Sequence, residues 1–574
     1  MKKEAARIAS IGLAVIAAKQ VEAWIKWERE RGKKLDYVQF TLPQTFITTP
    51  DQTKWYLRLL VKNEPVSLLD LEEAFDKLSK KPIKGIILIL RGFNQPFADL
   101  QSLRDLILKF KKSGKEVICY AQQFDMLTYY IASAGTKILA MPGASVYATG
   151  MRMEQTYLRD ALDTIGVEMD VVRISPFKGA LDSLLYSEPT ESGRNQMEWL
   201  LGSFYDTVME GIATERGIEL EALKALVDAA PYTDTQAVEK GLIDHVVNEE
   251  GFPAYLGSKL IETWTQVSKR FAPFIDIDLE IGTMPQQEPD DSVAILYTSG
   301  QIINGKSENP PVDLPIPFAG GPSIGDLTVV QQIRNLMQAE HVKALVLYVD
   351  SPGGSATASE AIASALDELA KRIPIVVYMG NVAASGGYYI STPAQWIVAQ
   401  PGTITGSIGV IMAKLITSGL YQKIKFNPVA YTRGENADLF SSQQGFTDSQ
   451  RAFMEDEIKR IYGLFVERVA KSRKMSFEEV DAIGGGRVWT GAQALENGLV
   501  DELGNLNTAI AKARQLAKLD ADARIEWVSH KTDPLPAQLA DRVNPAASWK
   551  FLNQRFDHLN GQSMLLMPYT FNID

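Results

Sequence analysis

The segment NVAASGGYYI, residues 381–390, places one serine between two alanines and two glycines. We expect small neighbours on both sides to leave the hydroxyl of Ser385 uncovered. A serine just before a helix also lies where the helix N-terminus adds positive potential, and Gly386 offers an unhindered backbone N–H beside it. These features indicate a nucleophile with part of an oxyanion hole, although small residues also allow a strand and a helix to pack closely.

A second glycine-rich stretch, DSPGGS at 350–355, follows a β-branched run. Gly353 and Gly354 can turn their backbone N–H groups toward a ligand, because glycine adopts positive φ without a Cβ clash. We predict that they form the oxyanion hole together with Gly386. A glycine turn by itself is common in loops, so this motif alone is equally consistent with packing.

A serine nucleophile needs a base, and histidine is the usual candidate. The chain has four histidines, none of them in a glycine-framed segment: His245, His341, His530 and His558. A Ser-His-Asp triad is therefore disfavoured. Lysine is the other option, provided that burial lowers its pKa from about 10.4 toward 7–8. Lys178 in ISPFKGALDS has a short apolar setting and is our candidate.

The elements that must position these residues belong to an internal repeat. KGIILILRG starts at Lys84 and KALVLYVDS at Lys343, an offset of 343 − 84 = 259. The same offset relates the YYI motifs at 129–131 and 388–390. Farther on, PYTDTQAVEKGLIDHV and VWTGAQALENGLVDEL correspond with an offset of 257. The chain therefore contains two diverged copies that differ by a small net deletion.

Within each copy, β-branched runs, Gly/Pro/Ser turns and helical stretches alternate as they do in βαβ units. The second copy predicts a strand over 342–350, a turn over 351–355, a helix over 356–372 and a strand over 374–380. Right-handed crossovers then place helices outside a mainly parallel sheet, and active groups gather where strands end and helices begin. The predicted fold class is α/β with two tandem domains.

The two copies carry different chemical groups. Subtracting 259 from Ser385 leads to Met126, so the first copy has no nucleophile at that position. Adding 257 to Lys178 leads to Glu435, so the second copy has no lysine there. The first copy keeps the lysine and the second keeps the serine.

These motifs resemble signal peptide peptidase A, also called protease IV, in its long form with two tandem domains. In that family the nucleophilic serine lies in an A-S-G-G-Y-[YW] segment, which residues 384–389 match. The general-base lysine lies in [YF]-K-[SG]-A, which residues 177–180 match. SPGGS at 351–355 and TGSIGV at 405–410 extend the resemblance, which covers roughly residues 40–518.

The resemblance implies two ClpP/crotonase-like α/β domains, a Ser385–Lys178 dyad, and Ser407 as the group that binds the lysine amine. It also implies a homotetramer that cleaves peptides such as signal-peptide remnants or other apolar, unfolded segments. No cofactor is predicted. The sequence has no His-x-x-x-His motif and a single cysteine, Cys119, so we expect no metal in the site.

We expect five parts along the chain. They are an N-terminal amphipathic helix (1–36), a first α/β repeat with the lysine (37–262), a linker (263–292), a second α/β repeat with the serine (293–518) and a C-terminal extension (519–574).

Charge and the N-terminal segment bear on partners and location. The net charge of −11 lacks the basic excess that nucleic-acid binding needs, so nucleic acid is not an expected partner. The uncharged stretch 8–18 is shorter than the ~20 residues that span a bilayer. An apolar arc with Trp24 and Trp27 suits an interfacial helix, and an ordinary helix packed on protein is the equal alternative. We therefore expect peripheral membrane association, with a cytoplasmic protein as the alternative.

Two other function classes remain open. A crotonase-like acyl-CoA hydratase or isomerase would also use a backbone oxyanion hole, but it needs acid/base carboxylates, and the pairing of DSPGGS with ASGG argues against it. The other is a catalytically silent scaffold docked to a membrane by the N-terminal helix. The presence of both Ser385 and Lys178 argues against that reading.

Overall fold

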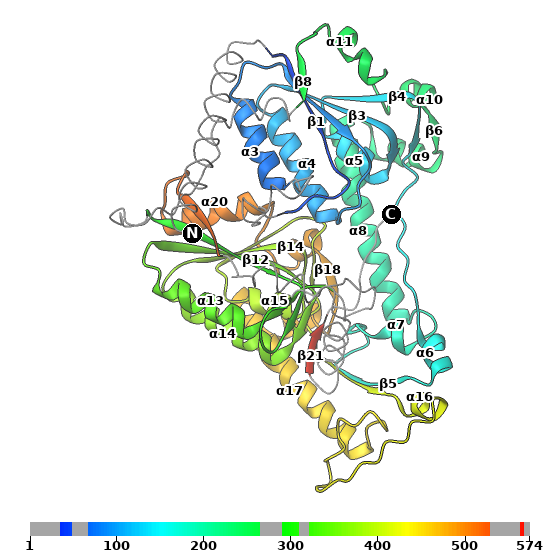
Figure 1. Cartoon of the computed structure of the whole chain (residues 1–574), viewed down its shortest axis with the longest axis vertical. Coiled ribbons are helices and arrows are strands. Elements are labelled where there is room, and N and C mark those ends of the chain that lie inside the picture. Colours follow the sequence, from blue (N-terminus) through cyan, green and yellow to red (C-terminus); the bar gives the residue numbers. More distant parts are fainter. Residues whose placement is uncertain (1–34, 49–66, 264–289, 309–320, 529–562, 567–574) are drawn as a thin grey trace, which may run out of the picture. The chain divides into compact units, whose positions relative to one another are not determined.

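The computed structural model describes most of both repeats (Figure 1). The described residues are 35–48, 67–263, 290–308, 321–528 and 563–566. The predicted N-terminal helix, most of the predicted linker and most of the C-terminal extension lie outside them. Within the described part, no helix combines the length and the apolar character needed to cross a bilayer.

The chain divides into two compact units whose borders do not follow the order of the sequence. Of the described residues, unit 1 comprises 35–48, 67–95, 103–150 and 208–263, and unit 2 comprises 96–102, 151–207, 290–308, 321–528 and 563–566. Residues 151–207 belong to the first repeat by sequence. They nevertheless fold with the second repeat, so Lys178 and Ser385 lie in the same unit.

Unit 1 contains a seven-stranded sheet in the order β6-β4-β3-β2-β1-β8, with β7 paired to β4. All its pairs are parallel except β4 with β6. Every residue of β2 is buried, as expected for a strand covered on both faces. The strands are β1 (Tyr37–Thr41), β2 (Gly85–Leu90), β3 (Glu116–Asp125), β4 (Lys137–Tyr147), β6 (Tyr232–Thr233), β7 (His245–Val246) and β8 (Ile261–Thr263).

The helices of unit 1 are amphipathic or short. They are α3 (Leu68–Ser79), α5 (Met126–Ser133), α9 (Leu220–Asp228), α10 (Asp234–Glu239), η1 (Glu249–Gly251) and α11 (Phe252–Tyr255). Two longer helices have residues in both units: α4 (Phe97–Lys111) and α8 (Glu191–Arg216).

Unit 2 contains two sheets. The larger has the order β18-β16-β14-β12-β9-β20, with β15 pairing β14 and β19, and only β16 with β18 is antiparallel. Its strands are β9 (Ser292–Ser299), β12 (Val342–Ser351), β14 (Ile375–Ala384), β15 (Trp396–Ala399), β16 (Ile404–Gly406), β18 (Val488–Thr490), β19 (Glu502–Leu503) and β20 (Arg524–Val528).

The second sheet of unit 2 has the order β11-β10-β13-β21-β17-β5. Its strands are β5 (Glu168–Arg173), β10 (Gln301–Ile303), β11 (Ser323–Gly325), β13 (Gly353–Ser355), β17 (Ile411–Ile416) and β21 (Ser563–Leu566). The helices of unit 2 are α6 (Arg159–Ile165), α7 (Asp182–Leu185), α13 (Asp326–Gln338), α14 (Ala356–Ala370), α15 (Gly386–Ser391), α16 (Ser418–Lys423), α17 (Asp448–Arg473), α18 (Phe477–Ile483), α19 (Gly491–Glu496) and α20 (Leu506–Ala517).

The elements of the two repeats coincide at the offsets found in the sequence. Adding 259 to the bounds of α4 (97–111) gives those of α14 (356–370), and adding it to β3 (116–125) gives β14 (375–384). Adding 257 to α10 (234–239) gives α19 (491–496). The predicted strand, helix and strand of the second copy are confirmed.

One predicted turn is wrong in part. Residues 353–355 form the short strand β13 rather than a turn, because Gly354 pairs with Ile302 on one side and with Leu565 on the other. A Cβ on Gly354 would lie 1.9 Å from the backbone oxygen of Ile302. Glycine is therefore needed here for close approach of two strands.

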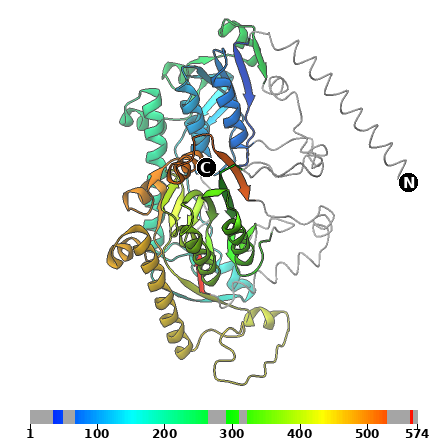
Figure 2. The same cartoon turned by 90° about the vertical axis from the view of Figure 1, so that its left-hand side faces the viewer.

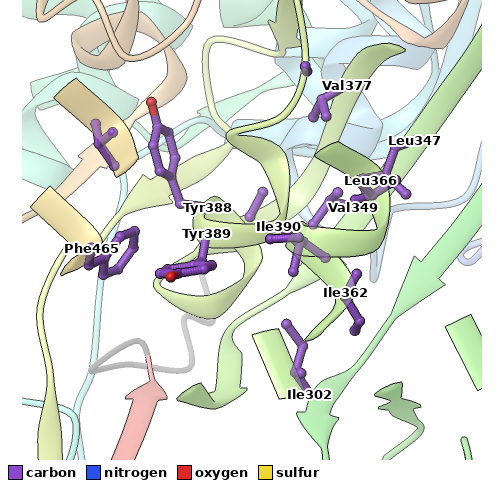
Figure 3. Packing of buried hydrophobic residues seen from close by; sticks show 14 of the residues in the cluster. Ile302, Leu347, Val349, Ile362, Leu366, Val377, Tyr388, Tyr389, Ile390 and Phe465 are labelled. Carbon is purple, nitrogen blue, oxygen red and sulfur yellow. The ribbon is translucent and has the colours of Figure 1, made fainter. Parts of the chain in front are cut away.

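Helix α15 is anchored in the core of unit 2 (Figure 3). Tyr388, Tyr389 and Ile390 are buried, and the ring of Tyr389 lies 4.8 Å from that of Phe465 on α17. The hydroxyl of Tyr388 donates to the carbonyl oxygen of Leu499 at 2.8 Å. This packing fixes the start of α15, where the candidate nucleophile lies.

Candidate active site

Ser385 occupies a sharp turn between β14 and α15. It is the N-cap of α15, with φ 55° and ψ −113°, a conformation that costs energy for any residue with a Cβ. Its N–H donates to the carbonyl oxygen of Gly406 at 2.8 Å, and its own carbonyl accepts from Tyr389 at 2.8 Å. A strained serine on a strand-to-helix turn is a geometry that presents a nucleophilic hydroxyl.

Lys178 reaches this hydroxyl from the segment between β5 and α7. Its Nζ lies 2.7 Å from Oγ of Ser385, 2.8 Å from the carbonyl oxygen of Ser407 and 2.9 Å from Oγ of Ser407. All three side chains are fully buried. The prediction that small neighbours leave Ser385 uncovered is therefore wrong, because the amine of Lys178 lies against its hydroxyl. The structure thus brings together the predicted serine, lysine and supporting serine, although Lys178 and Ser385 are far apart in the sequence.

The protonation state follows from burial and from the number of partners. Desolvation lowers the pKa of Lys178 well below 10.5. A neutral amine has two N–H donors and one lone pair. The two N–H groups match the two oxygens of Ser407, and the lone pair matches the O–H of Ser385. Neutral Lys178 is therefore placed to accept the serine proton.

Gly486 and Gly409 approach Lys178 closely, a contact that the sequence analysis did not predict. A Cβ on Gly486, whose φ is +91°, would lie 2.7 Å from the backbone N and Cα of Lys178. A Cβ on Gly409 would lie 3.2 Å from Cδ of Lys178. The glycine run at 484–486 was the available sequence signal for this close approach.

Aromatic rings cover the other side of the lysine segment. The ring of Phe177 lies 5.8 Å from that of Trp199, which stacks on Trp489 at 5.3 Å. The guanidinium of Arg487 lies 4.2 Å from the centre of the Phe177 ring. Together with the glycine contacts, this packing limits the movement of Lys178.

The three predicted oxyanion glycines lie close together beside Ser385. A Cβ on Gly386 would lie 3.1 Å from Cα of Gly353 and 3.2 Å from the backbone N of Gly354. The N–H of Gly353 already donates to Oγ of Ser351 at 3.2 Å. The structure therefore brings the three glycine backbones together, and the N–H of Gly353 already donates to the side chain of Ser351.

The two histidines in the described part of the chain contact other groups. His245 stacks on Tyr255 with ring centres 4.7 Å apart, and Nε2 of His341 lies 3.1 Å from a carboxylate oxygen of Glu526. His530 and His558 lie outside the described residues. In the part that the structure describes, no three His, Cys, Asp or Glu side chains group as metal ligands would.

Comparison with known proteins identifies the family. The sequence profile of peptidase family S49 matches residues 109–254 and 367–520, one segment in each repeat. The chain belongs to peptidase family S49. A Clp protease profile matches residues 325–396, which include the glycine turn and Ser385. The predicted α/β fold with two tandem, ClpP-like domains and mainly parallel sheets is confirmed.

Relatives within family S49 extend over most of this chain. "Serine protease SPPA, chloroplastic" from Arabidopsis thaliana is 30% identical over 472 residues, which are 81% of this chain and 68% of that protein. "Protease 4" from Haemophilus influenzae is 31% identical over 482 residues, 80% of this chain and 75% of that protein. The predicted resemblance is confirmed, and the chain is a serine peptidase of family S49.

Proposed function

We propose that this chain is an endopeptidase with a Ser-Lys dyad, in which Ser385 is the nucleophile and Lys178 the general base. The observation that carries the proposal is the buried contact of 2.7 Å between Nζ of Lys178 and Oγ of Ser385. The oxygens that surround the amine belong to hydroxyl and carbonyl groups. A carboxylate there would favour the charged amine and weaken the base.

The proposed reaction runs through an acyl-enzyme. Lys178 takes the proton of Ser385 as Oγ attacks a peptide carbonyl, and the N–H groups of Gly354 and Gly386 hold the oxyanion. Gly353 joins them when its N–H turns away from Ser351. The protonated lysine then gives its proton to the leaving amine, and neutral Lys178 activates the water that hydrolyses the ester.

The proposed substrates are extended, apolar peptides such as cleaved signal peptides or unfolded membrane-protein fragments. Burial of both Ser385 and Lys178 supports this proposal, because it disfavours access by folded proteins.

We also propose a homotetramer with the active sites facing an interior cavity. The segment that follows α16 extends away from the body of unit 2 (Figures 1 and 2). Large apolar side chains of this segment are exposed. Ile424, Phe426, Val429 and Tyr431 are 60–92% exposed. Apolar groups gathered on one exposed segment favour contact with another protein surface.

For location we propose peripheral membrane association through residues 1–36, with a cytoplasmic protein as the alternative. Flotation of the full chain with liposomes, compared with a version that starts near Asp36, tests this proposal. Equal flotation of the two versions would exclude the N-terminal segment as the membrane contact.

A serine-directed phosphonate probe tests the proposed chemistry. Wild type should be labelled at Ser385, Ser385→Ala should not be labelled, and Lys178→Ala should be labelled at least 10²-fold more slowly, since a positioned general base contributes 10²–10⁴-fold. A folded wild type that resists labelling would favour the silent scaffold. Turnover of an acyl-CoA without labelling would favour the hydratase.

A further inference from the structure

The segment Ser563–Leu566, strand β21, is inserted between two strands that lie far from it in the sequence. It runs antiparallel to β13, pairing Leu566 with Gly353, Leu565 with Gly354 and Met564 with Ser355. On its other side it runs antiparallel to β17, pairing Met564 with Ile411. Figure 1 shows β21 as the short red strand in unit 2.

This position is a strand slot, defined here as the space between β13 and β17. Without β21, the sheet order β11-β10-β13-β21-β17-β5 would be interrupted, and both β13 and β17 would present an unpaired edge. A single extended peptide of any origin can satisfy both edges with backbone hydrogen bonds. The slot therefore fits one β-strand, and the chain's own segment fills it.

The strand slot borders the candidate active site. Gly353 and Gly354, which pair with β21, are the residues whose backbones lie against Gly386. Gly386 is the first residue of α15 and directly follows Ser385. A peptide in the slot thus runs beside the nucleophile and its neighbouring backbone N–H groups.

One side chain of β21 is buried among apolar residues, and we call its surroundings the pocket of Met564. Met564 is 2% exposed and packs in a cluster with Ala180, Leu181, Ile411 and Ala413. Ala180 and Leu181 follow Lys178 by two and three residues, so the pocket adjoins the lysine segment. An acidic side chain in this pocket would be buried among apolar side chains, which is unfavourable.

We propose that Ser563–Leu566 is the resident occupant of the strand slot and that an incoming peptide must displace it. The displacing peptide is extended and places an apolar side chain of about the size of Met in the pocket of Met564. The identity of that peptide as a substrate rests on the proposed peptidase function, whereas the occupancy of the slot does not.

Displacement has a kinetic consequence. When only a fraction of the molecules has an open slot, the apparent dissociation constant of the peptide rises by the inverse of that fraction. A slot open in about one molecule in ten to one in a hundred raises it about 10- to 100-fold. Emptying the slot should therefore lower KM and leave kcat unchanged.

The first experiment changes Met564 in the full chain. Met564→Asp should lower KM for an apolar fluorogenic peptide by about tenfold or more at constant kcat, and Met564→Ala should lower it less. Leu327→Asp, at a position 63% exposed on α13, is the matched control and should behave as wild type. An unchanged or higher KM in both folded Met564 variants would overturn the proposal.

The second experiment does not depend on catalysis. In Ser385→Ala, a fluorescent peptide of residues 561–568, GQSMLLMP, should bind about tenfold or more tightly by anisotropy once Met564→Asp is added. The same peptide with Asp at the position of Met564 should not bind. Equal binding to both proteins would show that the tail is not the occupant. Tighter binding combined with an inactive wild type would instead refute the peptidase function alone.

Discussion

At the scale of single residues, the proposed reaction requires that the amine of Lys178 be neutral. In Lys178, burial favours the neutral form, and the two oxygens of Ser407 use the N–H groups and leave the lone pair for Ser385. This arrangement has a cost for folding. The unfolded chain binds the proton of Lys178 more tightly than the folded protein does. The lysine therefore destabilises the fold at every pH at which it is charged in the unfolded chain.

Replacement of the lysine should therefore change how stability depends on pH. Above pH 10.5 Lys178 does not lower the stability of the fold, because the lysine is then neutral in the unfolded chain as well. The destabilisation grows as the pH falls from 10.5 toward the lowered pKa of the folded state. Lys178→Met should be more stable than wild type near pH 7, and the difference in melting temperature should shrink toward pH 10. The exposed lysine variant Lys471→Met is the control. A difference that does not vary with pH would contradict a lowered pKa.

Gly486 offers a second test at this scale. Gly486→Ala would place a Cβ 2.7 Å from the backbone of Lys178 at a φ of +91°, so the lysine must move. A shift of about 1 Å in a reacting group can reduce the rate about 10²-fold, and we expect a loss of that size in kcat/KM. Gly434→Ala carries similar strain at φ +99° but meets no atom within 4 Å. Equal losses in the two variants would assign the effect to backbone strain alone.

Sequence reasoning singled out the two residues of the proposed dyad but not the residues that hold Lys178 in place. Ser385 and Lys178 lie in sequence motifs whose residue types indicate a nucleophile and a base. Gly486 does not, because the need for glycine there arises from a contact with Lys178 that only the folded chain creates. Likewise, the engagement of Gly353 by Ser351 could not be predicted from a glycine turn.

At the scale of elements, the same tyrosine hydrogen bond anchors α5, which follows β3, and α15, which follows β14. The hydroxyl of Tyr129 donates to the carbonyl of Leu242 at 2.8 Å, and that of Tyr388 donates to Leu499 at 2.8 Å. The tyrosines differ by 259 positions and the leucines by 257, the two offsets found in the sequence. The bond is therefore a property of the repeat rather than of the active site.

This equivalence predicts a contrast between two variants. Tyr129→Phe and Tyr388→Phe each leave a buried carbonyl without its donor, which should cost about 1–3 kcal/mol of stability. Only Tyr388→Phe loosens α15, so only that variant should lose activity, by several-fold. Urea denaturation and peptide hydrolysis at low temperature measure the two effects. An equal loss of activity in both variants would contradict a local role for α15.

Periodicity predicted the strands and helices of each repeat well, since their apolar patterns are long. It could not predict β21, because SMLL is too short to identify as a strand and its partners β13 and β17 lie elsewhere in the chain. It also could not show that residues 151–207 fold with the second repeat, because that depends on tertiary contacts.

At the scale of the whole molecule, the exposed apolar segment after α16 bears on the proposed tetramer. Phe426→Asp combined with Val429→Asp should yield smaller species by size exclusion with light scattering, because acidic groups oppose burial of these positions in an interface. Leu327→Asp, exposed on α13, should keep the size of wild type. A wild type that is monomeric at all concentrations would remove the cavity proposal.

The most direct test of the central claim is hydrolysis of an apolar fluorogenic peptide by wild type, Ser385→Ala and Lys178→Ala between pH 6 and pH 10. The account predicts that activity is lost in both variants and that the rate of wild type rises with pH through a pKa well below 10.5, as neutral Lys178 forms. Near-normal hydrolysis by Lys178→Ala, or equal activity in all three proteins, would contradict it.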